Sequence, residues 1–433
     1  MLDIKFVLEN ADAVKASEVA RGNDPEVVDE LLKLYDARNR TCGQFDEVRA
    51  KQQLLGKSVA AAKTQDERSK TLQELKLLAQ KVDAAKLAAV AAQNEYDVCA
   101  QKLQNVVVGA PSGGEDDYVV LKEVGQCATE QSLGFSPKHH SELGEQLGII
   151  DTDRGSKVSG SRFYFLKGLG ARLDLALINM GLDLALSNGF TPMVTPTLVR
   201  PEVMRGTGFL GLHDAEVYRL SEADDLYLVG TSEVALAGYY SDEIVEFLDG
   251  KPIKFAGFSA CYRREAGAAG KDTRGIIRVH QFHKLEMFVY CMQEHAEQEH
   301  AKLLEMEEQM ISALELPYRV IDVAAGDLGS SAARKFDCEA WLPSENRYLE
   351  LTSTSNCTTF QARRLGIRER FQDENAQSST RSVATLNGTL ATTRWIVAIL
   401  ENHQQEDRSV RIPEALRPYL GGVEVITPDS KGA

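Results

Sequence analysis

The chain has 433 residues, of which 43% are hydrophobic, and it carries 49 lysines and arginines against 64 aspartates and glutamates, a net charge of −15. This length allows two or three domains, and the hydrophobic share argues against a disordered chain. No stretch approaches the ~20 consecutive apolar residues of a membrane-spanning helix, and residues 1–10 lack the apolar run of a signal peptide.

The seven cysteines are scattered along the chain and form no Cys-x-x-Cys pair. An odd number at irregular spacing predicts neither a disulfide framework nor a thiolate zinc site. We therefore expect a soluble, cytoplasmic protein with reduced thiols, no zinc and no membrane contact.

Residues 27–106 contain no proline, and their apolar positions follow a seven-residue repeat. Such a repeat places its apolar residues in two rows along one side of a helix. In the second half both rows are apolar throughout, whereas in the first half Arg38, Thr41 and Gln52 interrupt them. The strict rows are Leu75, Val82, Ala89, Tyr96, Leu103 and Leu78, Ala85, Ala92, Cys99, Val106. A break at residues 63–66, where Thr64 or Asp66 can cap the second helix, predicts an antiparallel coiled-coil hairpin. At 1.5 Å per residue each helix would be about 55–60 Å long, so we expect a projecting arm.

The charge of this arm differs from that of the whole chain. Between Lys33 and Lys86 there are 12 lysines and arginines against 7 acidic residues, a net charge of +5, so the remainder carries −20. One interpretation is a solvated coiled coil or a partner-binding hairpin. The other is an arm that lays its outer half against a phosphate backbone. The residues that would make those contacts are Arg49, Lys51, Lys57, Lys63, Arg68 and Lys70.

A glycine-rich, acidic stretch at residues 109–117 predicts a linker, and hence domains at residues 1–110 and 111–433. The second domain should be α+β with an antiparallel sheet, because hairpin-like spacing outnumbers strand–helix–strand units. Expected strands cover residues 190–199, 225–229, 253–262, 279–290, 319–323 and 347–352, and expected helices cover residues 168–188, 293–314 and 391–403. No phosphate-binding motif of a parallel nucleotide-binding fold is present.

The segment from Arg263 to Met287 predicts a strand, a glycine-rich loop and a return strand. Strand alternation would place Arg263 with Glu265 on one face, and Arg278 with Glu286 on one face of the return strand. Each residue alone is compatible with a salt-bridged sheet surface. Two guanidiniums and two carboxylates together favour a site for a polyanion, because arginine offers bidentate donors to phosphate.

This segment resembles motif 2 of the class II aminoacyl-tRNA synthetases and, over its full length, that of the seryl-tRNA synthetase family. Motif 1 is similar over residues 170–200 and motif 3 over residues 383–404, with motif 2 spanning residues 255–290. Segments around Thr231, Lys335 and Glu350 and the N-terminal arm are also similar to that family, so the resemblance covers almost the whole chain.

The resemblance implies ATP bent over an antiparallel sheet, with Arg263, Arg394 and Glu350 as catalytic residues. Glu265 would accept from the adenine amino group, Phe282 would stack under the ring and Arg394 would cover it. Glu350 and Ser353 would hold Mg²⁺. The implied ATP-binding residues are Arg263, Arg264, Glu265, Val279, Phe282, Glu350, Leu351, Thr352, Ser353 and Arg394.

The resemblance also implies a pocket for serine, built from Thr231, Ser232, Glu233, Arg263, Glu286 and Thr389. Such a small hydrogen-bonding pocket would refuse alanine by leaving polar groups unpaired and threonine by sterics. From Asn387 to Arg394 is seven residues, one fewer than the commoner family spelling, which affects the loop that carries Thr389.

The implied function is ATP-dependent charging of serine tRNA by a homodimer that pairs through motif 1. The arm would clasp the tRNA, no DNA partner is implied, and selenocysteine tRNA is left open as a second substrate. Two alternatives compete with it. A ligase for a carrier protein normally lacks the arm, and a non-catalytic RNA-binding relative should have lost motif arginines or glutamates. His280 and His283 resemble half a metal site without a third ligand, and Trp341 and Trp395 are expected to be core aromatics.

Overall fold

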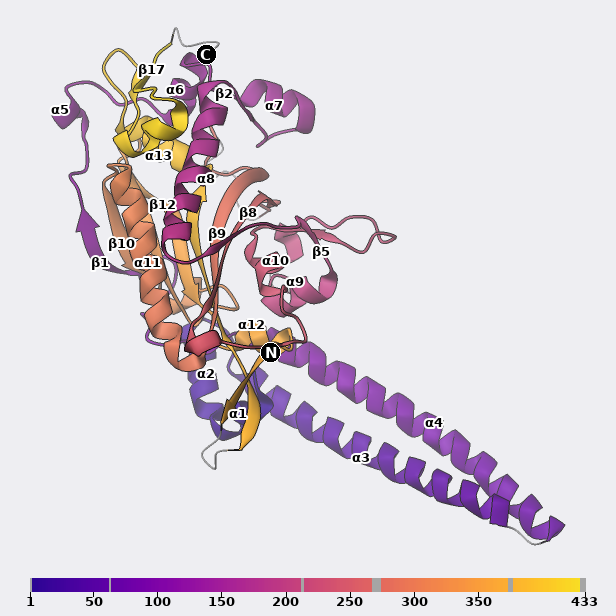
Figure 1. Cartoon of the computed structure of the whole chain (residues 1–433). Helices are drawn as coiled ribbons and strands as arrows, with labels where there is room; N and C mark the ends of the chain where they lie inside the picture. The colour runs from indigo at the N-terminus through magenta and orange to yellow at the C-terminus, as the bar shows by residue number, and fades with distance from the viewer. Residues whose placement is uncertain (1, 62–63, 212–213, 267–273, 373–376, 429–433) are drawn as a thin grey trace. The chain divides into compact units, whose positions relative to one another are not determined.

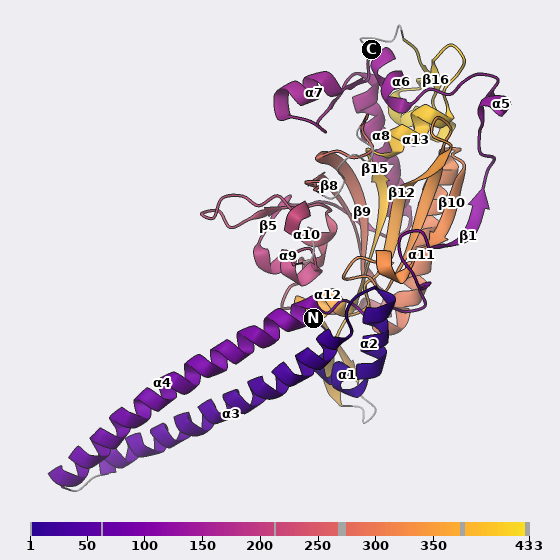
Figure 2. The same cartoon turned by 180° about the vertical axis from the view of Figure 1, so that it is seen from behind.

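The computed structural model describes residues 2–61, 64–211, 214–266, 274–372 and 377–428 (Figures 1 and 2). Its contacts divide the chain into two compact units, Met1–Gln104 and Asn105–Ala433. Within the described ranges, no helix combines the length and the apolar character needed to cross a bilayer.

The first unit contains the helices α1 (Ile4–Glu9), α2 (Ala11–Ala20), α3 (Glu26–Ala61) and α4 (Gln65–Lys102). The predicted cap at Thr64 is confirmed, since its hydroxyl accepts from the Glu67 N–H while the Glu67 carboxylate accepts from the Thr64 N–H. The two long helices pack side by side as an antiparallel pair, as Figures 1 and 2 show.

Two contacts give the register of this pair. Arg38 Nε donates to Gln93 Oε1 at 2.7 Å, and the ring centres of Tyr35 and Tyr96 lie 5.9 Å apart. Arg38, which interrupts the heptad row, is therefore accommodated by a polar partner on the other helix. The predicted row positions of α4 are buried or half-buried from Leu75 onward, as knobs-into-holes packing requires.

The second long helix ends earlier than the heptads predict. Its last residue is Lys102, and the backbone N–H of Asn105 donates to the Ser330 carbonyl of the second unit. The Asn105 side chain also donates to the carbonyls of Ser331 and Cys357. The hydrogen bonds of Asn105 thus take the place of a further helical turn. Val106, the last residue of the predicted apolar rows, belongs to the second unit and not to the helix.

The second unit is built on an eight-stranded sheet in the order β1-β10-β11-β12-β15-β9-β8-β4. All neighbours are antiparallel except β8 and β4, which confirms the predicted α+β class with a mainly antiparallel sheet. The strands are β1 (Val119–Val124), β10 (Tyr318–Asp322), β11 (Arg334–Leu342), β12 (Arg347–Asn356), β15 (Ala384–Thr392), β9 (Gln281–Cys291), β8 (Ile253–Tyr262) and β4 (Thr191–Val194).

Helices α8 (Leu169–Ser187) and α11 (Ala296–Ala313) pack against one face of this sheet (Figure 1). Alternation along β9 turns Leu285 and Met287 into the core on that side, so the residues between them face the other side. The opposite face is covered by a second core at Phe288 and Tyr290 and is left open at Phe282 and Lys284, which line a pocket.

Helix α13 (Trp395–Asn402) is almost entirely buried in the same core, and Trp395 has no exposed surface, as predicted for a core aromatic. The helix begins four residues later than predicted, because Ala391 and Thr392 remain paired with β9 at the end of β15. Trp341 is only half-buried, and its indole N–H donates to the Ala128 carbonyl at 2.8 Å.

The other elements are short. The predicted strand 190–199 is split into β4 and β5 around Pro196, which has no N–H for a ladder. The remaining helices are α5 (Glu130–Leu133), α6 (His140–Gln146), α7 (Thr152–Ser159), α9 (Pro201–Thr207), α10 (Glu233–Ala237) and α12 (Phe360–Arg364), and the 3₁₀ turns are η1 (Asp214–Glu216), η2 (Leu248–Gly250), η3 (Gln293–His295), η4 (Ala325–Asp327) and η5 (Glu414–Leu420). The remaining strands are β2 (Ile150–Asp151), β3 (Phe165–Leu166), β5 (Leu198–Val199), β6 (Tyr227–Leu228), β7 (Ile244–Val245), β13 (Arg368–Gln372), β14 (Ser378–Ser382), β16 (Val410–Arg411) and β17 (Val425–Ile426).

Candidate active site

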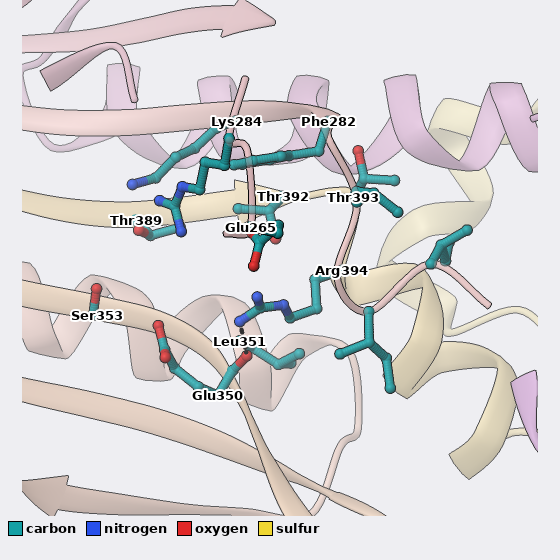
Figure 3. A pocket seen from close by; sticks show the side chains of 14 residues that line it. Glu265, Phe282, Lys284, Glu350, Leu351, Ser353, Thr389, Thr392, Thr393 and Arg394 are labelled. Carbon is teal, nitrogen blue, oxygen red and sulfur yellow. Dashed lines mark hydrogen bonds between the residues drawn. The ribbon is translucent and has the colours of Figure 1, made fainter. Parts of the chain in front are cut away.

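A pocket lies on the open face of the sheet, over strands β9, β12 and β15 (Figure 3). It brings together residues from the segments after residue 260 that the sequence singled out. The lining residues are Arg263, Glu265, Ile276, Ile277, Val279, Phe282, Lys284, Glu350, Leu351, Ser353, Thr389, Thr392, Thr393 and Arg394.

Two arginines give the pocket its positive charge. Arg263 follows directly after β8, where its Nε donates to the Gly230 carbonyl at 3.3 Å and its guanidinium carbon lies 5.2 Å from the centre of the Phe282 ring. Arg394 precedes α13 and donates from Nη1 to the Glu350 carbonyl at 2.9 Å. Figure 3 shows its side chain between Glu265 and Glu350. Both guanidiniums keep further N–H groups for an anionic ligand.

The predicted grouping of two arginines and two glutamates is only partly right. Arg278 Nη1 lies 3.5 Å from Glu265 Oε2, so these two residues do converge. Glu286 stands in the middle of β9, opposite Gly257 of β8, where Arg263 is among the charges that act on it. The alternation argument fails because β9 begins at Gln281, so that Arg278 is not part of the strand that carries Glu286.

Arg264 turns away from this pocket. Its guanidinium carbon lies 5.8 Å from the centre of the Tyr218 ring, and its backbone N–H donates to the Glu216 carbonyl. Consecutive residues of an extended chain point to opposite sides, which separates Arg264 from Arg263. Thr352 is also turned away, since its buried hydroxyl donates to the Thr389 carbonyl at 2.7 Å.

Beside Arg263 lies a buried polar cluster centred on Glu286. Lys284 Nζ lies 2.5 Å from Glu286 Oε2 and donates to Thr231 Oγ1 at 3.2 Å. Thr389 of β15 stands directly opposite Glu286, despite the shorter loop that follows it. Sequence reasoning missed Lys284, although Phe282, Lys284 and Glu286 alternate on one strand face and so carried a signal for it.

Glu233 closes the cluster from the first turn of α10. Its Oε1 accepts from Gln361 Nε2 at 2.7 Å and from Asn387 Nδ2 at 3.0 Å, two residues that the sequence analysis did not select. Burial, together with the Glu286 carboxylate, raises the pKa of Glu233 to about 7. The neighbouring Ser232 is buried and donates to the Gly257 carbonyl at 2.9 Å, so its hydroxyl holds β8 in place.

Glu350 and Ser353 both line the pocket and offer the oxygen atoms that Mg²⁺ prefers. Burial alone would raise the pKa of Glu350, but Lys335, Arg394 and Arg263 outweigh burial and hold that pKa below its ordinary value. The carboxylate therefore stays ionised at neutral pH, which a cation ligand requires. The residues present fit a Mg²⁺ ion.

His280, directly before β9, and His283, within it, do not share a site. His280 Nδ1 lies 3.0 Å from the Arg263 carbonyl oxygen, whereas His283 Nδ1 lies 2.5 Å from Asp174 Oδ2. Asp174 Oδ1 also accepts from the Thr393 hydroxyl at 2.9 Å, so this aspartate of α8 holds the residue before Arg394. Both histidines therefore have structural partners.

The arm residues selected for tRNA binding are surface side chains of the first unit. Arg49, Lys51 and Lys57 of α3 and Arg68 and Lys70 of α4 are exposed, and the Arg49 guanidinium carbon lies 5.9 Å from the centre of the Phe45 ring. Lys63 lies outside the described residues.

A pocket with two arginines on a mainly antiparallel sheet is the arrangement expected of a class II aminoacyl-tRNA synthetase. Residues 218–403 match the family model described as "tRNA synthetase class II core domain (G, H, P, S and T)". A prolyl-tRNA synthetase from Giardia lamblia shares the fold, with a TM-score of 0.55 at 16% identity over 65% of this chain and 57% of its own.

The particular family follows from the whole chain. Residues 1–107 match the model "Seryl-tRNA synthetase N-terminal domain". The chain is 61% identical to "Serine--tRNA ligase" of Beutenbergia cavernae and 60% identical to that of Micrococcus luteus, over 98% of this chain and 99% of each relative. The chain belongs to the seryl-tRNA synthetase family.

Solved structures agree with this assignment. The seryl-tRNA synthetase of Pyrococcus horikoshii, complexed with ATP, matches with a TM-score of 0.87 at 38% identity and covers 99% of this chain and 100% of its own. The cytoplasmic serine-tRNA ligase of Naegleria fowleri, in complex with AMP, matches with a TM-score of 0.81 at 30% identity over 96% of both chains.

Proposed function

We propose that this protein activates L-serine with ATP and transfers the serine to the 3′ end of serine tRNA. The observation that carries the proposal is the buried Lys284–Glu286–Thr231 cluster, whose Lys284 lines the same pocket as Arg263 and Arg394. It offers buried charged and hydrogen-bonding groups next to a site for phosphates, which is what a seryl-adenylate requires.

In the first step a serine carboxylate oxygen attacks the α-phosphorus of ATP. A new P–O bond forms, the bond to the β-phosphate oxygen breaks, and pyrophosphate leaves. Arg263 would hold the serine carboxylate and the α-phosphate together and stabilise the charge that develops on the phosphoryl oxygens. Its bond to the Gly230 carbonyl holds the guanidinium in place before the substrates arrive.

In the second step a terminal ribose hydroxyl of the tRNA attacks the carbonyl carbon of the adenylate. AMP leaves with the electron pair of the broken C–O bond, and the hydroxyl proton would pass to the departing phosphate. The enzyme needs no covalent intermediate in either step. Its contribution is the placement of the two reactants, which is worth several kcal/mol when the reacting atoms are about 3 Å apart.

The nucleotide would lie across the Phe282 side of the pocket. Glu265 would accept from the adenine amino group, Val279 would present backbone atoms to the base, and Phe282 and Arg394 would enclose the ring. Beside the phosphates, Leu351 contributes an apolar wall. Glu350 and Ser353 would hold Mg²⁺, which supplies charge neutralisation at the phosphates when bound.

Selection of serine would depend on the buried polar cluster around Glu286. Glu286 and Glu233 would face the ammonium group, while Thr231 and Thr389 would limit the size of the pocket and bond to the small hydroxyl side chain. Lys284 offsets the charge of Glu286. Alanine would leave these buried polar groups without a partner.

The proposal also covers the oligomeric state, the location and the tRNA partner of the protein. We infer a cytoplasmic homodimer that pairs through motif 1, since α8 and β4 expose Leu175, Leu186 and Val194 to solvent. The arm would bind serine tRNA through phosphate contacts, because A-form RNA is recognised by shape and backbone. Selenocysteine tRNA would be a second substrate if it shares the features that the arm contacts.

The purified protein should catalyse serine-dependent ATP–pyrophosphate exchange and should charge serine tRNA. Both activities are measured with labelled pyrophosphate and labelled serine, with alanine and threonine as competitor controls. Exchange without charging would point to a carrier-protein ligase, and the absence of both would leave a non-catalytic RNA-binding protein.

Glu286→Gln should raise the KM for serine about 100-fold or more while changing the KM for ATP only a few-fold. The substitution keeps the shape but removes the negative charge that would face the serine ammonium, a loss of roughly 3 kcal/mol for a buried charged partner. The measurement is exchange kinetics at varied serine and varied ATP.

Glu369→Gln is a matched control for this variant. Glu369 is also buried and is paired with Arg381 Nε at 2.8 Å, but it lies on β13, outside the pocket lining. Its replacement should leave both KM values near those of the wild type. An equal rise in the KM values for serine and ATP in Glu286→Gln would assign Glu286 to the architecture of the sheet instead.

A further inference from the structure

A buried histidine lies against the chain that returns from the β8–β9 connection into the pocket. His140, the first residue of α6, has no exposed surface. Its Nε2 lies 3.2 Å from the backbone nitrogen of Ile276 and accepts its N–H. These two residues are 136 positions apart in the chain, so the contact is purely tertiary.

The other ring nitrogen is held by Glu401 of α13. His140 Nδ1 lies 3.2 Å from Glu401 Oε1, and the His140 backbone N–H donates to the same oxygen at 3.1 Å. Glu401 Oε2 accepts from the Ser344 hydroxyl at 2.7 Å and from the backbone N–H of the same serine at 3.3 Å. A carboxylate partner places the proton on Nδ1, which leaves Nε2 as the acceptor that Ile276 needs.

The loop backbone is fitted closely to this ring. Gly275, the residue before Ile276, has a φ of +73°, and a Cβ added there would lie 2.0 Å from His140 Nε2. Only glycine combines that backbone angle with that approach. The end of the connection is therefore docked on the imidazole, with the glycine as the point of contact.

The docked segment leads directly into the nucleotide pocket. Ile276, Ile277 and Val279 line it, and Arg278 between them pairs with Glu265. At the other end of the network, α13 begins directly after Arg394, another lining residue. The His140–Glu401 pair thus connects the two segments that would enclose the adenine ring.

We propose that His140, oriented by Glu401, is a positioning residue that fixes the returning end of the β8–β9 connection for nucleotide binding by accepting the Ile276 N–H. This inference rests on the proposed function of the pocket as an ATP site. His140 touches neither the substrates nor the reacting atoms, so its effect should fall on the ATP affinity more than on the serine KM.

The inference requires a neutral imidazole. Burial lowers the pKa of His140, a change that the Glu401 carboxylate opposes, and the adjacent His139, which lies 3.0 Å from Glu345, also disfavours a second positive charge. The acceptor is therefore present at neutral pH. It is lost as the pH falls far enough to protonate Nε2, so the ATP affinity of the wild type should weaken on the acid side.

Two substitutions of His140 test the roles of the two ring nitrogens separately. His140→Gln places an oxygen acceptor near the position of Nε2, whereas His140→Asn retains a donor near Nδ1 and leaves the Ile276 N–H unpaired. His140→Asn should weaken the binding of a non-hydrolysable ATP analogue about 10-fold, with the serine KM changed less than about 3-fold. His140→Gln should restore most of the ATP affinity and remove its acid dependence.

The affinity for the ATP analogue is measured by calorimetry at several pH values, and the serine KM is measured by pyrophosphate-exchange kinetics. Equal ATP affinity in the two variants, or an equal rise in the serine KM, would overturn the role of His140. If neither variant folds, Gly275→Ala tests the same contact, because it displaces the docked segment and leaves His140 in place. Wild-type ATP affinity in folded Gly275→Ala would also overturn it.

Different results would contradict the proposed function and the positioning role of His140. Absence of serine-dependent exchange in the wild type would count against the proposed function. An active wild type whose ATP affinity does not distinguish glutamine from asparagine at position 140 would count only against the positioning role.

Discussion

Arg263→Ala should abolish serine-dependent pyrophosphate exchange, with a loss of about 100-fold or more in kcat/KM, or roughly 3 kcal/mol of transition-state stabilisation. The guanidinium is held by the Gly230 carbonyl and lies against Phe282 at the point where the two substrates would meet. Arg263→Lys should remain strongly impaired, because an ammonium group cannot bridge the carboxylate and the phosphate through a planar fork.

The neighbouring arginine provides the contrast for this prediction. Arg264→Ala removes a contact with Tyr218 on the other side of the chain, so its reduction of exchange should be much smaller. Urea unfolding of both variants checks that the fold is retained. A folded Arg263→Ala that exchanges pyrophosphate at the wild-type rate would remove Arg263 from the mechanism.

Shortening the arm should nearly eliminate tRNA charging while leaving pyrophosphate exchange largely intact. Residues 43–88 can be replaced by a short turn, which leaves four residues beyond each partner of the Arg38–Gln93 contact and so keeps the helices in register. A deletion that runs to residue 106 would be unsuitable, because Asn105 is bonded within the catalytic unit. All pocket-lining residues lie beyond the deleted segment.

A charge-only variant tests how the arm binds. Replacing Arg49, Lys51, Lys57, Arg68 and Lys70 with glutamine keeps the helix propensity and the apolar rows and removes five exposed positive charges. The tRNA KM should rise, and the slope of log affinity against log salt should fall by up to about 0.7–0.9 for each phosphate that the variant no longer touches.

Pyrophosphate exchange and helix content, measured on the same five-residue variant, show whether its fold is retained. Unchanged tRNA affinity and an unchanged salt slope in the folded variant would favour the simpler interpretation, that the arm is a solvated coiled coil. Its charges would then keep a coiled coil soluble without touching phosphate.

The sequence by itself determined the local features of this protein. A seven-residue apolar repeat can bury its stripe only against a second helix, so the arm and its turn at Thr64 followed from periodicity and capping. The strand Ile253–Tyr262 also matches its predicted bounds. Strand alternation selected Arg263 and Glu265, and the resemblance to the class II synthetases added Glu350 and Arg394. The structure brings all four to one pocket.

Only the tertiary structure decided which of these groups meet. Lys284 reaches Thr231 across 53 residues, Asn387 reaches Glu233 across 154, and Glu401 reaches His140 across 261. It also turned Arg264 out of the pocket and placed Arg278 outside the strand that carries Glu286. Periodicity describes which face of one element a residue occupies, whereas partners, burial and the resulting pKa of groups such as Glu233 depend on how distant elements pack together.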